Sequence, residues 1–289
     1  MLDYFMLYIV ATPIGNLMDL SYRAIDILQK SDLIAVEDTR KSKILLNHYN
    51  INIKTISLHE HNEKQIVVKL LDLLRQGKNI SLISDAGTPL ISDPGYHLVR
   101  AAHLENIPVS PIPGPSAVMA AVSSSGIAVD QFIFIGFLPA KLSQKQKVLL
   151  DLALEQRTMI FFEAPNRLLK TVNCMQKIFG IERTVTFCRE LTKKFETIKR
   201  DQLANIYQFI CSDQLNQTKG EIVIVVEGNK NNKDNPKNTT QIDASTQKIL
   251  RILMKELPLT KAASLAAKIT GIPKKMLYEA GAALPKTHV

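Results

Sequence analysis

Short apolar runs alternate with amphipathic stretches along the first part of the chain. The runs at residues 7–11 and 33–36 are rich in β-branched residues and too short for buried helices, which is typical of buried strands. The stretches that follow them space apolar residues three and four positions apart, as one face of a helix requires. This pattern predicts strands at 7–11, 33–36, 55–58, 80–84 and 108–112 and helices at 21–30, 41–49, 63–76, 96–105 and 117–124.

The same alternation resumes near Gly126 and ends at residue 228. It predicts strands at 132–136, 158–162, 184–189 and 221–227, helices at 144–156 and 168–179, and a polar helical stretch at 194–211. From residue 229 the chain becomes rich in Asn and Lys and loses its apolar periodicity, which indicates a linker that extends to residue 241. Three further helices are expected, at 249–257, 260–270 and 274–283.

These elements predict two α/β domains, residues 7–125 and 126–228, followed by a linker and a small basic helical module at 229–289. In residues 7–124, strands that alternate with helices over short connections favour a parallel or mostly parallel sheet. Open α/β sheets bind their ligands at the carboxyl ends of the strands. Polar and glycine-rich clusters directly follow the strands of this chain, so we expect the functional site there.

The charge of the chain is positive and unevenly distributed. With 46% hydrophobic and 22% charged residues, the 289-residue chain has enough apolar material for a sizeable core, and disorder is excluded as its general state. The formal net charge is +9. Residues 229–289 hold 11 Lys and Arg against 4 Asp and Glu, so this module carries most of the excess. An excess of this kind suits a nucleic acid partner, although lysine also serves plain solubility.

Several classes of protein are excluded by residue usage. The three cysteines have no CxxC spacing and no Cys/His cluster has the spacing of zinc ligands, so we expect neither a disulfide framework nor a metal site. Reduced thiols fit a cytoplasmic protein. The apolar start lacks the basic region and cleavage site of a signal peptide, and no apolar run reaches the roughly 18 residues of a membrane span.

The segment with the strongest functional signal is residues 84–95, SDAGTPLISDPG. Gly87 and Gly95 permit close backbone approach, while Pro89 and Pro94 stiffen the segment. This composition exceeds what a crossover turn needs and indicates a binding loop. The chain contains neither GxGxxG nor GxxxxGK[ST], so a nucleotide-like cofactor would bind in another way. Residues 113–117 open a helix that either receives an anion or simply begins with Ser116 as its N-cap.

Eight short motifs in a fixed order carry a resemblance to a known family. They are residues 12–17 (TPIGNL), 37–40 (EDTR), 59–63 (HEHNE), 84–95, 113–117 (PGPSA), 136–139 (GFLP), 189–193 (RELTK) and 219–223 (KGEIV). In this order the chain resembles the ribosomal RNA small subunit methyltransferase I family of the tetrapyrrole methylase superfamily, from about Leu7 to the C-terminus. One departure lies at residues 163–167 (EAPNR), where the resemblance leads us to expect a small residue and His in the middle.

The resemblance implies a fold of the tetrapyrrole-methylase type that binds S-adenosyl-L-methionine between its two α/β domains. It implies 2'-O-methylation of a cytidine ribose in small-subunit (16S) ribosomal RNA, alone or in the assembled 30S subunit. It also implies a homodimer. The second domain's share of the cofactor site would include Leu138 and residues 221–228. Carried over by position, the other cofactor-binding residues are Pro13, Asp85, Ala86, Gly87, Thr88, Pro89, Ser92, Pro113, Gly114, Ser116 and Ala117.

A ribose hydroxyl is a weak nucleophile at neutral pH, so a general base or a charge-stabilising group should assist methyl transfer. The candidates are polar residues at strand ends: Glu37, Asp38, His59, His61, Asp85 and Glu190. We select Asp38, His61 and Glu190 as catalytic residues. Asp38 could instead cap the next helix, and the two histidines could instead bind a metal or lie on a solvated edge.

Basic residues supply the candidates for RNA contact, because phosphates are bound mainly by Arg and Lys. They are Arg40, Arg189, Lys193, Lys268, Lys274 and Lys275. In the tail, Ala267, Gly271 and Leu277 have the spacing of a helix–turn–helix. This module either grips RNA or packs as a helical hairpin on the second domain.

Two other functions fit parts of the sequence. A relative in the same superfamily could methylate a small tetrapyrrole or a modified protein residue, but the basic tail and the motifs between residues 37 and 63 favour RNA. A non-enzymatic nucleic-acid-binding protein would explain the tail and leave the loops at the strand ends without a role.

Overall fold

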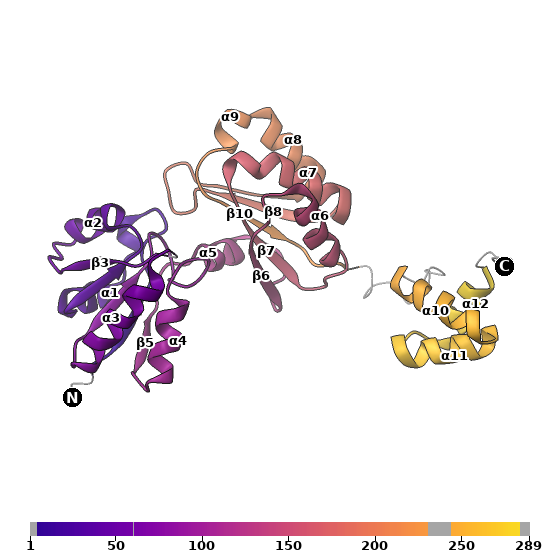
Figure 1. Cartoon of the computed structure of the whole chain (residues 1–289). Coiled ribbons are helices and arrows are strands. Elements are labelled where there is room, and N and C mark those ends of the chain that lie inside the picture. The colour runs from indigo at the N-terminus through magenta and orange to yellow at the C-terminus, as the bar shows by residue number, and fades with distance from the viewer. Residues whose placement is uncertain (1–4, 60, 231–243, 284–289) are drawn as a thin grey trace. The chain divides into compact units, whose positions relative to one another are not determined.

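The computed structural model describes residues 5–59, 61–230 and 244–283, and the chain separates into two compact units. The first unit, Met1–Asn229, contains two five-stranded sheets with their helices (Figure 1). The second unit, Lys230–Val289, is helical in its described part and is called the helical unit below. None of the helices in the described ranges combines the length and apolar character that a membrane span requires.

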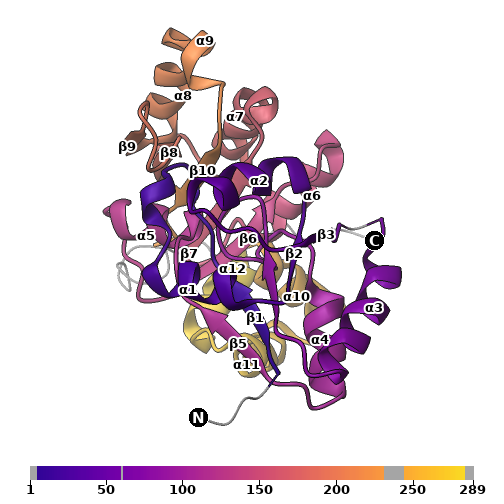
Figure 2. The ribbon, with the colours of Figure 1, turned by 90° about the vertical axis from the view of Figure 1, so that its left-hand side faces the viewer.

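The first sheet has the strand order β3-β2-β4-β1-β5, and all its strand pairs are parallel. Its strands are β1 (Leu7–Val10), β2 (Leu33–Val36), β3 (Thr55–Ser57), β4 (Ile80–Ile83) and β5 (Val109–Ile112). Helices α3 (Glu63–Arg75) and α4 (Tyr96–Leu104) pack on one face of this sheet, while η1 (Leu17–Asp19), α1 (Tyr22–Lys30) and α2 (Thr39–His48) pack on the other (Figure 2). Successive strand residues alternate between the two faces, so each face has a core of its own.

The second sheet has the strand order β6-β7-β10-β8-β9, in which only the β6–β7 pair is parallel. Its strands are β6 (Phe132–Phe137), β7 (Thr158–Glu163), β8 (Thr184–Arg189), β9 (Thr197–Gln202) and β10 (Ile222–Val226). Helices α6 (Leu142–Asp151), α7 (Leu168–Phe179) and α8 (Leu203–Ser212) pack on one face, and α5 (Ala117–Ser124) packs on the other. The remaining elements are η2 (Pro165–Arg167) and α9 (Gln214–Gln217).

Most predicted elements are confirmed with ends displaced by one or two residues. Ser21 caps α1, and Ser116 caps α5 as one of its two predicted roles. The polar helical stretch at 194–211 is wrong in its first half, because residues 197–202 form β9. This strand alternates half-buried and exposed residues and pairs with β8 along the edge of the sheet. A polar edge strand has little apolar periodicity of its own, so pairing with β8 decides its structure.

The helical unit contains α10 (Ala244–Glu256), α11 (Leu259–Thr270) and α12 (Lys274–Ala283) around a small core of Leu250, Ala262, Ala263, Ala266 and Leu277. The predicted helix at 249–257 begins earlier, at Ala244. Gly271 ends α11 with φ 74°, and its N–H donates to the carbonyl of Ala267. The predicted turn between two helices is therefore confirmed. Residues 231–241 of the predicted linker lie outside the described residues.

The end of β7 is fixed by a buried carboxylate. The side chain of Glu163 is fully buried and accepts hydrogen bonds from the backbone N–H of Ala164 at 2.8 Å and from Nε of Arg167 at 2.7 Å. Its other oxygen lies 3.4 Å from Nζ of the buried Lys145, and Thr171 donates to the same oxygen. These contacts determine the turn from β7 into η2.

Replacing Glu163 by Gln should strongly destabilise the second sheet, because Lys145 and Arg167 would lose the anion that compensates their burial. We expect the free energy of unfolding to fall by about 3 kcal/mol in urea titrations. The control is Asp26→Asn, which removes a carboxylate from the exposed pair with Lys30 and should cost less than about 1 kcal/mol. Equal losses in the two variants would contradict a structural role for the buried cluster.

Candidate functional site

A cavity of about 430 Å³ lies between the carboxyl edge of the first sheet and the second sheet. The first sheet contributes the segments after β1, β2 and β4, as expected for an α/β fold. The second sheet contributes the ends of β6 and β7 and the start of β10. The lining consists of Ile14, Glu37, Lys41, Asp85, Ala86, Gly87, Thr88, Ile91, Ser92, Asp93, Ser116, Ala117, Val118, Phe137, Phe162, Glu163, Ala164, Pro165, Leu191, Gly220, Glu221, Ile222 and Val223.

The loop at 84–95 is tightly held. Gly87 and Thr12 exchange two backbone hydrogen bonds of 2.8 and 2.9 Å, and Thr88 Oγ1 donates to the carbonyl of Pro115 at 3.1 Å. Leu90 and Ser92 adopt left-handed conformations, with φ 73° and 69°. Such conformations are costly for residues other than glycine, and they occur at functional sites where the surrounding structure imposes them.

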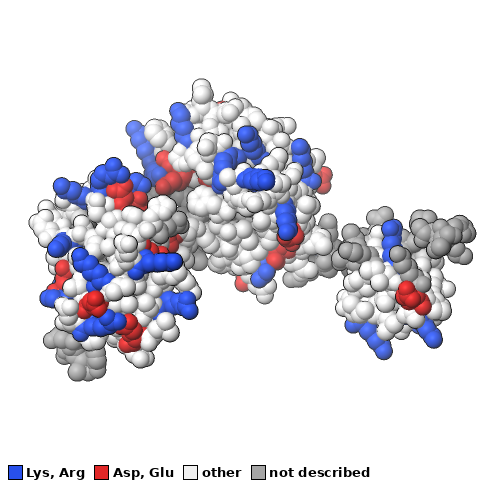
Figure 3. Space-filling view, viewed as in Figure 1, with Lys and Arg blue, Asp and Glu red and all other residues white. Residues whose placement is uncertain are grey.

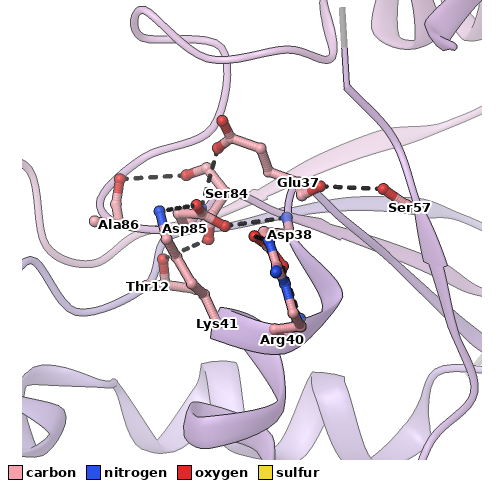
Figure 4. Close-up of polar contacts among 9 residues, drawn as sticks. All are labelled: Thr12, Glu37, Asp38, Arg40, Lys41, Ser57, Ser84, Asp85 and Ala86. Atoms are coloured by element: carbon pink, nitrogen blue, oxygen red, sulfur yellow. Dashed lines mark hydrogen bonds and ion pairs between the residues drawn. The ribbon is translucent and has the colours of Figure 1, made fainter. Parts of the chain in front are cut away.

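Charged side chains from β2, α2 and the loop meet at one wall of the cavity (Figure 4). Nζ of Lys41 lies 2.7 Å from Oδ2 of Asp85, and Oδ1 of Asp85 accepts the backbone N–H of Asp38 at 3.1 Å. The backbone N–H of Asp85 donates to Oε2 of Glu37 at 3.4 Å. Asp93 lines the same cavity and forms a side-chain hydrogen bond with Ser84. The ends of β2 and β4 thus bring three carboxyl groups and one lysine together.

Two of these carboxyl groups are unusually basic. Burial raises the pKa of Glu37, and the charge of Asp85 raises it further. Burial also raises the pKa of Asp93 to about 6, with smaller upward contributions from the charges of Glu37 and Asp85. The hydrogen bond with Ser84 opposes this shift in the pKa of Asp93. Both carboxyl groups therefore hold a proton to higher pH than exposed carboxyl groups do, because their surroundings disfavour the charged form.

Seven of the predicted cofactor-binding residues line the cavity, and five do not. Those in the lining are Asp85, Ala86, Gly87, Thr88, Ser92, Ser116 and Ala117. Pro13 and Pro89 are each next to a lining residue in the chain, and Pro113 and Gly114 precede the lining residue Ser116 by three and two positions, but none of the four belongs to the lining. Leu138 is only 2% exposed and belongs to the core of the second sheet, so its side chain is committed to packing.

The three predicted catalytic residues lie outside the lining. Asp38 caps α2 by accepting the backbone N–H of Arg40, and the Arg40 side chain lowers the pKa of Asp38 to about 2, which makes it a weak base. Glu190 accepts from Nζ of Lys193 at 2.7 Å and from the N–H of Glu221 at 2.9 Å. Burial acts to raise the pKa of Glu190, but these hydrogen bonds outweigh burial and the pKa is lowered overall. His61 is exposed, with its ring 6.0 Å from that of His59.

The predicted RNA-binding residues differ in accessibility. Arg189 is 8% exposed and donates to the carbonyl of Phe195, so little of it remains for a phosphate. Lys193 lies between Glu190 and Glu221, and its side chain packs against Gly15. The accessible ones are Arg40, Lys268, Lys274 and Lys275. The described residues contain no cluster of His, Cys, Asp or Glu that would hold a metal ion.

The sequence did not single out several lining residues. Lys41 looked like part of a helix, and Asp93 counted only toward the composition of its loop. Phe137 and Phe162 resembled ordinary strand residues. Their ring centroids lie 5.5 Å apart in an edge-to-face arrangement beside the cavity. Alternation along β6 and β7 would have placed these aromatic residues on one face, but it does not show that this face meets a cavity.

Comparisons with known proteins extend over nearly the whole chain. The family described as Tetrapyrrole (Corrin/Porphyrin) Methylases matches residues 6–207, and the family described as RsmI C-terminal HTH domain matches residues 240–285. The chain is 48% identical to the "Ribosomal RNA small subunit methyltransferase I" of Pasteurella multocida, over 95% of this chain and 96% of that protein. It is 45% identical to the protein of the same name from Escherichia coli O157:H7, over 94% and 93%.

Solved structures of low sequence identity share the fold of the first unit. A cobalt precorrin-4 methyltransferase has a TM-score of 0.58 at 18% identity, over 78% of this chain and 95% of that chain. A diphthine synthase has a TM-score of 0.58 at 12% identity, over 77% and 90%. The predicted fold class is thereby confirmed.

Asp93→Asn should stabilise the protein at high pH. The raised pKa of Asp93 means that the folded state holds its proton more tightly than the unfolded state, whose ordinary value is 3.8. The stability this gives the wild type is complete below pH 3.8 and lost as pH rises through about 6. The variant should therefore gain on the order of 1 kcal/mol at pH 8, after allowance for solvent screening, and much less at pH 4.5. Urea titrations at both pH values, with the exposed Asp130→Asn as control, measure this; equal effects at the two pH values would contradict it.

Proposed function

The chain belongs to the ribosomal RNA small subunit methyltransferase I family of the tetrapyrrole methylases, and on that premise we propose that it methylates small-subunit ribosomal RNA. The methyl donor of this family is S-adenosylmethionine. The observation that carries the proposal is identity of 44–48% to relatives of this name over about 95% of the chain, including the helical unit. The finer part of the proposal is the acceptor, the 2'-hydroxyl of a cytidine ribose in 16S RNA, which rests on the sequence resemblance.

The chemistry of the cavity suits S-adenosylmethionine. Its volume falls within the roughly 300–1,000 Å³ typical of small-molecule sites. Apolar side chains such as Ile14, Val118 and Leu191 offer a surface for an adenine ring. Glu37 and Asp85 offer negative charge, which suits the sulfonium and ammonium groups of the cofactor. We propose that Asp85 to Thr88, together with Ser116 and Ala117, hold it.

When bound, the cofactor supplies an activated methyl group. The residues of the chain then have to align the acceptor oxygen with that group and exclude water, because methyl transfer is an in-line displacement. The pinned backbone at Gly87 and Thr88 suits this task, since a loop fixed by Thr12 and Pro115 needs little reorganisation during the reaction. The aromatic residues Phe137 and Phe162 provide an apolar wall on the opposite sheet.

The helical unit is our candidate for RNA contact. Lys268 lies in the last turn of α11, Lys274 and Lys275 begin α12, and all three side chains are exposed. Basic side chains project from this unit in Figure 3. Arg40 is a further candidate on the first unit, with 89% of its side chain exposed. We also propose that the protein acts in the cytoplasm as a homodimer on the RNA or on the assembled 30S subunit.

The other two functions receive less support. The precorrin methyltransferase and the diphthine synthase share the fold at 12–18% identity, which bears on fold alone. The match of residues 240–285 to the C-terminal domain of the RNA-methylating family favours RNA over a small tetrapyrrole or a protein residue. Membership of a methyltransferase family argues against a purely nucleic-acid-binding protein.

Small subunits that lack ribose methylation should accept label from S-adenosylmethionine at a single nucleotide. A methylated ribose resists alkaline cleavage, so mapping the protected position identifies both the reaction and the target. We expect one protected cytidine. Cofactor binding without any incorporation into RNA would contradict the proposed function and favour the small-molecule or protein-methylating alternative.

Replacing Lys268, Lys274 and Lys275 together by Gln should weaken RNA binding and leave cofactor affinity unchanged. Loss of three phosphate contacts should reduce the slope of log affinity against log salt by about 2. The matched control replaces Lys147, Lys170 and Lys177 by Gln. These lysines are exposed on α6 and α7, so their replacement removes the same charge. Filter binding over a salt series measures the slope. The same loss in both triple variants would show that net charge matters and the helical unit has no special role.

A further inference from the structure

Six ionisable side chains line the cavity, and they fall into two groups. Four of them belong to ion pairs: Lys41 with Asp85 at 2.7 Å, Glu163 with Lys145 and Arg167, and Glu221 with Lys193 at 2.9 Å. Among the ion pairs of the described residues, none involves Glu37 or Asp93. These two carboxyl groups are therefore the ones left to exchange a proton with a ligand.

The backbone on both sides of Asp93 is fixed. Ser92 precedes it in a left-handed conformation, with φ 69°, and Pro94 follows it. The next residue, Gly95, donates its N–H at 3.1 Å to the buried carboxylate of Glu63. A side chain at Gly95 would lie 2.6 Å from Leu82 Cδ2, so this part of the loop packs directly on β4. Strain and buried contacts of this kind hold Asp93 at the cavity wall.

Charged or titratable groups lie around the segment that holds Asp93, at the ends of β2 and β4 and on α2, α3 and α4. Glu37 at the end of β2 and Asp85 after β4 are both acidic and both act to raise its pKa. Lys41 on α2 is engaged by Asp85. Glu63 at the start of α3 and His97 on α4 flank the loop, where Glu63 accepts the N–H groups of Gly95 and His97. The surroundings thus make Asp93 a better proton acceptor than a surface aspartate, with its pKa at about 6.

We propose that Asp93 is the proton acceptor for the hydroxyl group that the enzyme methylates, and that Glu37 beside it strengthens this role. The inference rests on the proposed function and names the residue that assists its chemical step. As the acceptor oxygen forms its bond to the methyl carbon, its proton passes to the Asp93 carboxylate. The bond between carbon and sulfur breaks, and its electron pair stays on sulfur, which becomes neutral. The protonated carboxyl group then releases its proton to water.

Asp93→Asn keeps the shape of the side chain and removes its basicity. We expect the single-turnover rate of methyl transfer to fall by about 100-fold or more, the range of general base catalysis. Cofactor affinity in calorimetry should change less than threefold, on the order of what a lost peripheral contact costs. The wild-type rate should rise with pH up to about 6 and then level off, because the ionised form is the base, and the variant should lack this limb.

Glu37→Gln tests the supporting role separately. Loss of its negative charge should move the acidic limb of the wild-type profile to lower pH and reduce the rate less than Asp93→Asn does. The matched control is Asp130→Asn, an exposed aspartate outside the lining, which should leave both the rate and the profile unchanged.

A measurement without RNA gives an independent readout. In protein labelled with ¹³C at the aspartate carboxyl, the resonance missing from Asp93→Asn should titrate with a midpoint near pH 6 and move down in Glu37→Gln. An ordinary midpoint near 3.8 would overturn the proposal. So would a full single-turnover rate in Asp93→Asn, or a rate loss that weaker cofactor binding explains completely. If the wild-type chain fails to methylate small subunits while the resonance titrates as expected, the proposed function is what fails.

Discussion

The packing of α5 against the second sheet is the constraint on which the cavity depends. This helix follows β5 of the first sheet directly, yet Val118, Ala121 and Val122 bury their side chains against β7, β8 and β10. Burial of each of the two valine side chains is worth about 1.5–3 kcal/mol. Because its first turn also contributes Ser116 and Ala117 to the lining, α5 joins the two walls of the site as a single rigid element.

The distribution of charge separates two tasks that would otherwise conflict. The chain as a whole has a net charge of +9, whereas its cavity presents Glu37, Asp85 and Asp93 around a single engaged lysine. An acidic interior suits a cationic cofactor and a proton acceptor, and a basic exterior suits an anionic polymer. The exposed lysines of the helical unit add to this basic exterior, and they belong to a part of the chain that has its own core.

Several features of the loop at 84–95 lower the free energy of unfolding, as is common at functional sites. Leu90 and Ser92 hold conformations that cost free energy, and Asp93 is kept where its charged form is disfavoured. The buried Glu63 and the exchange between Thr12 and Gly87 offset this by fixing both ends of the loop. On the opposite wall, Glu163 fixes the end of β7 by accepting hydrogen bonds from Ala164 and Arg167.

The sequence by itself determined the elements whose signals are local. Strands such as β2 and helices such as α7 follow from apolar runs and spacing, and the caps at Ser21 and Ser116 follow from residue type. The binding loop also carries its own signal, since its glycines and prolines adjoin one another in the chain. Tertiary structure alone decided β9, whose polar residues become a strand only through pairing with β8.

Tertiary structure also decided which polar residues are available for chemistry. Asp38, Glu190 and Arg189 have suitable chemical types, but each is already engaged. Asp38 caps a helix, Glu190 accepts from a lysine, and Arg189 donates to a backbone carbonyl. Lys41 and Asp85 are 44 residues apart and still form a pair, while Asp93 remains without one among the described ion pairs. Periodicity in a sequence reports how a residue lies relative to its own helix or strand. The partner of a charged side chain depends on which distant elements fold beside it, and folding of the whole chain determines that.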